Sequence, residues 1–326
     1  MNDPNLRRRF TATLLATVAA TLVPSSMALA QSDKPLRLLV GYAAGGPVDS
    51  MARIVAPLLA RELGQPVLVE NKTGASGALA GEATVGAATD GLSLFFAASP
   101  TITIVPHILK KMRWDPARDL TPIAPVLSYA NVLVVNKEHP ARSLEELIAY
   151  ARANPSKVFY GSAGVGSSNH LSGELLAAQA KLQLVHVPYK GNAPAMNDVI
   201  GGQLTMMFDI VGGARKFISG GQVRALAVTS ASRNPMLPDV PTLRESGLPN
   251  YEVLGWFGLY GPAKLPAATT ARLADAMRRV QSSPEMQTRL AELGYAPWIG
   301  SGEQLAAVAK KEFELWATVT KGIELD

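Results

Sequence analysis

The sequence predicts an α/β fold with largely parallel sheets, divided into two domains. Apolar runs of strand length alternate with helical stretches along the chain, the order that produces α/β layers. The chain has 326 residues, 48% of them hydrophobic and 17% charged, so it can bury one large core or two medium ones. Residues 38–72 and 158–191 share the same expected order of elements, an internal echo: strand, glycine-rich loop, helix, strand, loop. This repeat is explained equally well by two lobes of similar build and by two βαβ units in one sheet.

The elements before residue 100 follow clear local signals. Residues 36–42 form a continuous apolar run, as in a buried strand. A helical pattern runs over 48–63 and ends at Gly64, a residue that commonly terminates helices. Short strands are expected at 67–70 and 93–98, with a helix over 78–88 between them.

The same alternation continues to the C-terminus. After a strand at 132–136, Ser143 is expected to cap a helix through 153, with Glu145 and Glu146 in its first turn. A strand at 157–161 and a helix over 169–181 form the second copy of the echo. Further strands are expected at 184–188, 206–209, 224–229 and 256–260, and further helices near 267–281, 284–293 and 302–321.

The N-terminus has the pattern of an export signal. Arg7, Arg8 and Arg9 precede an apolar run over 10–23, which is too short for a permanent membrane span. Ala28-Leu29-Ala30 then matches the small-x-small pattern of a signal-peptidase site. We therefore predict a signal peptide over 1–30, cleaved near Ala30, and a periplasmic location. The arginines fit a twin-arginine signal and a general secretory signal equally well.

Composition excludes several classes of function. Without residues 1–30 the net charge falls from +5 to +3, and this excess is mild and scattered, which argues against nucleic acid as a partner. The absence of cysteine excludes disulfides, thiolate metal sites and cysteine nucleophiles. The 4 histidines show no ligand spacing with carboxylates, so no metal is expected. Neither a phosphate-binding loop nor a dinucleotide fingerprint is present, and we expect no cofactor.

The first glycine-rich loop, residues 41–49, has the features of an anion site. Pro47 suits the first helical position, which makes Gly46 the expected N-cap. Gly45 and Gly46 carry no side chains, so a ligand can approach their N–H groups at the positive end of the helix. Asp49 falls in the first turn, where a capping carboxylate is the better interpretation than a ligand contact.

The second loop, residues 161–170, repeats this arrangement with hydroxyl groups. Ser167 or Ser168 is well placed as the N-cap of the next helix. With Ser162 and Asn169 they can donate to a carboxylate without adding charge. A capped turn that serves only the helix is the alternative. Two such loops on similar lobes favour a shared anion site.

Weaker candidates lie at other strand ends. Asp209 follows the strand at 206–208 and could accept a hydrogen bond from a ligand or hold a neighbouring loop. Ser99 and Thr101 close the strand at 93–98, at the end where open α/β sheets bind ligands. His170 at a helix start is expected to be a surface or packing residue. No Gly-x-Ser-x-Gly motif is present, so a hydrolase nucleophile is unsupported.

Taken together, these motifs resemble the Bug-type receptors of tripartite tricarboxylate transporters over nearly all of the mature chain. The first segment that shows this resemblance is Gly41-Tyr42-Ala43-Ala44-Gly45-Gly46-Pro47 with Asp49. The other matching segments are 63–75, 161–171, 186–191, 208–209, 224–230 and 237–242. Val48 departs from the pattern, because many members have a hydroxyl residue there, and residues 89–94 are a variant of the usual stretch.

The resemblance implies a type II periplasmic binding-protein fold, with two α/β lobes around a ligand cleft and two crossing segments. Lobe one would comprise 31–125 plus 255–326, and lobe two 126–254. The implied ligand is a small mono-, di- or tricarboxylate, an acidic amino acid or an aromatic acid, held largely by main-chain groups. The implied ligand contacts are Tyr42, Ala44, Gly45, Ser99, Ser162, Gly166, Ser167, Ser168, Asn169 and Asp209.

On this interpretation the protein is not an enzyme but a monomeric solute-binding protein whose partners are integral membrane transporter subunits. Hinge closure would bury the ligand between two helix N-termini. A ligand-sensing receptor for signalling is an alternative that the chain cannot separate from transport. An enzyme on the same scaffold, with Asp209 or His170 as base, is the least supported alternative.

Overall fold

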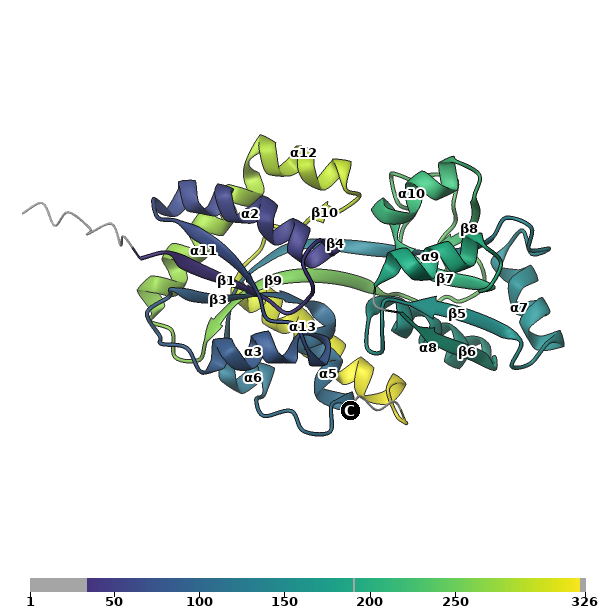
Figure 1. Cartoon of the computed structure of the whole chain (residues 1–326), viewed down its shortest axis with the longest axis horizontal. Helices are drawn as coiled ribbons and strands as arrows, with labels where there is room; N and C mark the ends of the chain where they lie inside the picture. The colour runs from purple at the N-terminus through teal and green to yellow at the C-terminus, as the bar shows by residue number, and fades with distance from the viewer. Residues whose placement is uncertain (1–33, 190, 323–326) are drawn as a thin grey trace, which may run out of the picture. The chain divides into compact units, whose positions relative to one another are not determined.

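The structure is a computed structural model that describes residues 34–189 and 191–322, so the predicted signal peptide over 1–30 lies outside the described residues. Figure 1 shows the alternation of strands and helices that the sequence predicts. Within the described ranges, no helix combines the length and the apolar character that crossing a membrane requires.

The N-terminal elements form a parallel group of strands. Strand β1 (Leu36–Val40) lies between β2 (Val67–Asn71) and β3 (Ser93–Ala98) and pairs with both in parallel. Helix α2 (Pro47–Leu63) connects β1 to β2 and ends at Gly64, as predicted. The shorter helices of this part are η1 (Ala75–Gly77), α3 (Ala78–Val85), α4 (Ser99–Thr103), α5 (Val105–Ile108) and α6 (Pro116–Asp119).

One long strand, β4 (Leu120–Asn136), pairs in both halves of the sheet, and β9 (Leu254–Pro262) lies along its first part. β4 pairs antiparallel with β9 up to Ala130. From Asn131 onward β4 pairs instead with β7 (Met206–Ile210) and β8 (Val223–Val228). β9 also pairs antiparallel with β3, and the short β10 (Ala296–Pro297) adds to β4. Figure 1 shows β4 and β9 running alongside each other.

The strand expected at 132–136 is therefore only the end of a 17-residue strand. Pro122 and Pro125 interrupt the strand pattern in the sequence, because proline lacks the N–H that a ladder needs. The structure accommodates both prolines with register shifts in the pairing of β4 and β9, one beside Pro122 and one beside Pro125.

The second half of the sheet repeats the plan of the first. β5 (Val158–Ser162) pairs in parallel with β6 (Leu184–Pro188) and β7, so it has the position among its neighbours that β1 has. Helix α8 (Ser168–Ala180) connects β5 to β6, as α2 connects β1 to β2. The remaining helices here are α7 (Leu144–Ala153), α9 (Asn192–Ile200) and α10 (Val211–Ser219). Neither α9 nor α10 is expected from the sequence patterns.

The C-terminal helices return to the first half. Side chains of α11 (Ala267–Ser282) and α12 (Pro284–Glu292) join the same core cluster as β1 and α2, among them Leu273 and Leu290. Helix α13 (Gly302–Val319) packs along β4 and α4. Near the end of α13, Trp316 joins a different core cluster, with residues of β5 and α8. The lobe bounds given above stay a prediction.

Candidate functional site

The two glycine-rich loops lie at equivalent places in the repeated plan. One connects β1 to α2 and the other connects β5 to α8, each at the carboxyl end of a strand with parallel neighbours. As predicted, Gly46 is the N-cap of α2 with Pro47 in its first turn, and Ser167 is the N-cap of α8. The carboxyl ends of parallel strands are the usual ligand-binding edge of open α/β sheets.

Asp49 holds the first loop in place. Its buried carboxylate accepts hydrogen bonds from Gly45 N–H at 2.8 Å, Arg53 Nε at 3.0 Å and Asn71 Nδ2 at 2.9 Å. Burial opposes ionisation, but the hydrogen bonds from Arg53, Gly45 and Asn71 outweigh it and lower the pKa of Asp49. Asp49 thus serves the chain itself, in line with the predicted capping role.

This arrangement corrects one expectation about Gly45. Its N–H, expected to be open to a ligand, is already a donor to Asp49. The residue has a φ of 81°, the left-handed conformation that favours glycine. Ala44 and Gly45 remain exposed, so their backbone can still be reached from outside.

Ser76 links the first loop to the second. The hydroxyl of Tyr42, in the first loop, donates to Ser76 O at 3.2 Å, and Thr101 Oγ1 donates to the same carbonyl at 2.8 Å. Ser76 Oγ in turn donates to the carbonyl of Val165 in the second loop, at 3.1 Å. Ser76 is therefore a direct bridge between the segments that carry the two predicted halves of the site.

The serine hydroxyls of the second loop bond mainly within the protein. Ser162 Oγ accepts Gly164 N–H at 3.1 Å and lies 2.6 Å from His186 Nε2. Ser167 Oγ donates to Gly164 O at 2.7 Å and accepts His170 N–H at 3.3 Å. These hydroxyls, expected as ligand donors, first of all define the shape of the loop.

Ser168, Asn169 and Asp209 form a buried group behind this loop. Ser168 Oγ accepts from Tyr129 OH at 3.4 Å, and Asn169 Nδ2 donates to Phe208 O at 2.9 Å, next to Asp209. Each of the three is less than a tenth exposed.

Asp209 itself is a carboxyl group held away from water. It accepts from Ile210 N–H at 2.8 Å and from Asn192 Nδ2. Burial raises the pKa of Asp209 to about 6, against the lowering effect of these bonds. The last predicted contact, Ser99, is buried at the start of α4 and accepts Trp256 N–H at 3.3 Å.

Backbone donors at both helix starts precede the helical hydrogen-bond ladder. The first such bond of α2 runs from Ser50 N–H to Gly46 O, and that of α8 from Leu171 N–H to Ser167 O. The earlier N–H groups, at Val48 and Asp49 in α2 and at Ser168 and Asn169 in α8, are not part of that ladder. Such groups, together with the helix dipole, suit a carboxylate.

Three residues that bond or pack against these loops are not identified as such by the sequence analysis. Ser76 has no motif of its own, although the flanking Gly74 and Gly77, both with positive φ, are a signal of an unusual loop. His170 and His186 are far apart in sequence, but their rings stack with centroids 3.9 Å apart. His170, expected to be a surface or packing residue, is buried and so does not lie on the surface.

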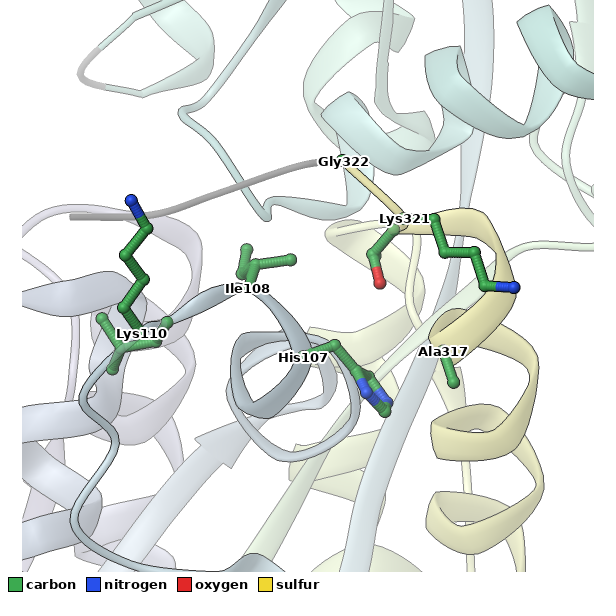
Figure 2. Close-up of a pocket in the computed structure, with 8 residues that line it drawn as sticks. His107, Ile108, Lys110, Ala317, Lys321 and Gly322 are labelled. Atoms are coloured by element: carbon green, nitrogen blue, oxygen red, sulfur yellow. The ribbon is translucent and has the colours of Figure 1, made fainter.

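A cavity of about 290 Å³ lies between α5 and the end of α13, and none of the ten predicted contacts is among the residues that line it. Figure 2 shows His107, Ile108, Lys110 and Lys321 around it. Within residues 34–189 and 191–322, no cluster of histidine and carboxylate side chains could hold a metal ion.

Comparison with known proteins identifies the family. The model of the tripartite tricarboxylate transporter family receptor matches residues 51–325. Among solved structures, the periplasmic binding protein BugD is 34% identical with a TM-score of 0.79, over 89% of this chain and 98% of that one.

Two further structures are similar over most of their length. Rpa4515 from R. palustris, solved with adipate, is 32% identical with a TM-score of 0.81, over 88% of this chain and 96% of its own. MatC from Rhodopseudomonas palustris, solved with bound malate, is 32% identical with a TM-score of 0.80, over 87% and 98%. The predicted family and the predicted two-lobed α/β fold are confirmed. The chain belongs to the tripartite tricarboxylate transporter receptor family of solute-binding proteins.

Proposed function

We propose that this protein captures a small carboxylate in the periplasm and delivers it to the membrane subunits of a tripartite tricarboxylate-type transporter. The observation that carries the proposal is the pair of equivalent loops, β1–α2 and β5–α8, each opening a helix and linked through Ser76. The relatives solved with adipate and with malate support an acid as the ligand.

Several donor groups of the two loops already have hydrogen-bond partners within the protein, which narrows the choice of groups that can bind the ligand. Because Gly45 N–H donates to Asp49, and because the hydroxyls of Ser162 and Ser167 have protein partners, the first-turn N–H groups are the better carboxylate donors. We place one acid group of the ligand at the start of α8, by Ser168 and Asn169. The full proposed set is Tyr42, Ala44, Gly45, Ser99, Ser162, Gly166, Ser167, Ser168, Asn169 and Asp209.

Asp209 has a different proposed role in this set. A carboxylate repels a second acid group, so Asp209 would instead accept a hydrogen bond from a ligand hydroxyl or ammonium. Its raised pKa also allows it to be protonated and donate to a ligand below about pH 6. On this basis a hydroxy acid or an amino acid should bind better than the matching unsubstituted acid.

Release is proposed to follow from the neutral character of the donors and from hinge motion. Backbone N–H groups hold an acid without a fully desolvated ion pair, which suits a ligand that must leave again. The proposed lobes, 31–125 plus 255–326 and 126–254, would move about β4, which pairs in both halves of the sheet, and about the start of β9, which lies along it. The closed form would be the one that membrane subunits bind.

Isothermal titration with a panel of acids tests the proposal. Protein freed of carried-over ligand should bind at least one member of a panel containing malate, succinate, adipate, aspartate and citrate. The diamide of the best acid, which has the same length without the charge, should bind at least about a hundredfold more weakly. Asp209→Asn should reduce the preference for malate over succinate. Ser219→Ala, on the exposed end of α10 in the same half, is the matched control. Absence of heat with every acid, or equal binding of acid and diamide, contradicts the proposal.

A further inference from the structure

Two imidazoles lie together behind the β5–α8 loop. His170 comes from α8 and His186 from β6, and their rings stack at 3.9 Å with an interplanar angle of 26°. The ring of Tyr160, from β5, lies 5.0 Å from His186. The sequence separates the two histidines by a helix and a loop, yet the fold makes them one unit.

Each imidazole bonds a different point of the loop. His170 Nδ1 accepts the N–H of Gly166 at 3.1 Å, and His186 Nε2 lies 2.6 Å from Ser162 Oγ. Gly166 has a φ of 78°, and a Cβ there would come within 2.9 Å of the Ile108 side chain. The loop conformation is thus one that few residues adopt, and the imidazoles hold it at both ends.

The hydrogen bond from Gly166 fixes the protonation state of His170. Because Nδ1 is an acceptor, the ring proton of His170 must be on Nε2, which lies 3.6 Å from Glu174 Oε1. Glu174 Oε1 also accepts from Tyr160 OH. A second proton on His170 could go only to Nδ1, where it would break the bond to Gly166.

We propose that His170 and His186 are positioning residues: a neutral, stacked imidazole pair that holds the loop from Ser162 to Ser167 in its ligand-ready shape. This inference rests on the proposed function for its link to ligand binding, but the state of the loop can be measured without a ligand. Neither ring touches the ligand in this proposal, and neither transfers a proton to it.

The surroundings of the pair favour the neutral state. The groups that face the rings are Tyr160 from β5, Ser162 at its end, and Glu174 from α8. Burial lowers the pKa of His170 to about 3, with His186 adding to the effect, and burial lowers the pKa of His186 to about 4. Two adjacent cations at this stacking distance would also repel each other.

Nitrogen NMR of the ligand-free, full-length mature protein tests the protonation state directly. We expect an unprotonated, acceptor-type Nδ1 and a protonated Nε2 on His170, unchanged between pH 8 and pH 5. We also expect slow hydrogen exchange at the Gly166 amide. A protonated Nδ1 on His170, or a titration of either ring near the ordinary value of about 6.5, overturns the proposal.

Variants test the link to binding, with malate and adipate as probes. His170→Leu removes the acceptor and should weaken binding about tenfold or more, since a buried donor then lacks a partner. His170→Asn restores an acceptor near the position of Nδ1 and should bind within about threefold of wild type. His186→Gln, which keeps a polar atom near Nε2, should likewise retain more affinity than His186→Leu.

His139→Leu is the matched control. His139 Nδ1 also accepts a backbone N–H, from Ala141 at 3.2 Å, but it contacts Tyr150 and not the loop. This control should leave affinity unchanged. Wild-type affinity in folded His170→Leu, or no rescue by Asn, overturns the proposal. Should the leucine variants not fold, the protonation state of the wild-type histidines, measured by NMR, decides. Should wild type bind no member of the acid panel, the proposed function fails, while hydrogen exchange at the Gly166 amide still tests the loop.

Discussion

The imidazole pair predicts a specific response of stability to acid. In the unfolded chain a histidine has a pKa near 6.5, whereas in the fold the values are about 3 for His170 and about 4 for His186. Because the folded pKa is the lower one, the unfolded state binds more protons below pH 6.5. Above about pH 7.5 both histidines are neutral in the folded and the unfolded chain, so they do not reduce the free energy of unfolding. As the pH decreases below that value, the free energy of unfolding falls.

The magnitude follows from the size of the shifts. Each such histidine changes the free energy of unfolding by up to about 1.4 kcal/mol per pH unit. Lowering the pH from 7 to 5 should reduce the free energy of unfolding by about 2 kcal/mol through His170. The partly exposed His186 should reduce it further, by about 1–2 kcal/mol, after allowing for solvent screening. The pair should therefore cost about 3–4 kcal/mol over this range.

The wild-type profile alone does not isolate this effect. Burial raises the pKa of Asp209 to about 6 and that of Glu312 to about 8, so protonation of these carboxyl groups in the fold stabilises it as pH decreases. The double variant His170→Asn/His186→Gln retains both carboxyl groups. Their contributions cancel when the variant and the wild type are compared at each pH.

Urea denaturation followed by circular dichroism at pH 7 and pH 5 measures the difference. The free energy of unfolding of the variant minus that of wild type should be more favourable to the variant by about 3–4 kcal/mol at pH 5 than at pH 7. A difference in the free energy of unfolding that stays constant within about 1 kcal/mol between the two pH values would show that the fold does not hold the histidines neutral.

Two further substitutions test how the loops and crossing strands are held. Asp49→Asn should lower the free energy of unfolding by about 1–3 kcal/mol, because Gly45 N–H loses a charged acceptor. The control Asp275→Asn, in an exposed ion pair, should change the free energy of unfolding by less than about 0.5 kcal/mol. Equal effects of the two substitutions would argue that Asp49 does not anchor the loop. Thr229→Val should lower the free energy of unfolding by about 2–4 kcal/mol, because the buried hydroxyl accepts Asn131 N–H and donates to Val253 O. Thermal unfolding measures the loss, with Thr270→Val as the exposed control. A loss as small as that of the control would contradict the prediction.

Much of the fold could be predicted because its signals are local. The echo between 38–72 and 158–191 corresponds to a real repeat in the sheet, with β1 and β5 each between two parallel neighbours. The first part of β4 could not be predicted, since Pro122 and Pro125 disrupt the strand pattern and the compensating register shifts arise only from pairing with β9. Pairing of distant segments is invisible in a local pattern.

The site could be predicted only as far as its loops. The glycines and serines identified both helix starts, but the sequence does not show which donors the protein uses itself. Gly45 N–H turns to Asp49, and Ser162 turns to His186, because the fold brings these partners within reach. Ser76 and the imidazole pair depend entirely on contacts between segments far apart in the chain, so no spacing of residues indicates them.

In the proposed complex, backbone N–H groups at two helix starts hold the acid. A crystal structure with the tightest-binding acid would locate these contacts. We expect a carboxylate oxygen within about 3 Å of the N–H groups of Ser168 and Asn169, with the β1–α2 loop on its other side. A ligand bound elsewhere, such as in the cavity beside α5, or an acid group paired with a lysine or arginine instead, would contradict the proposal.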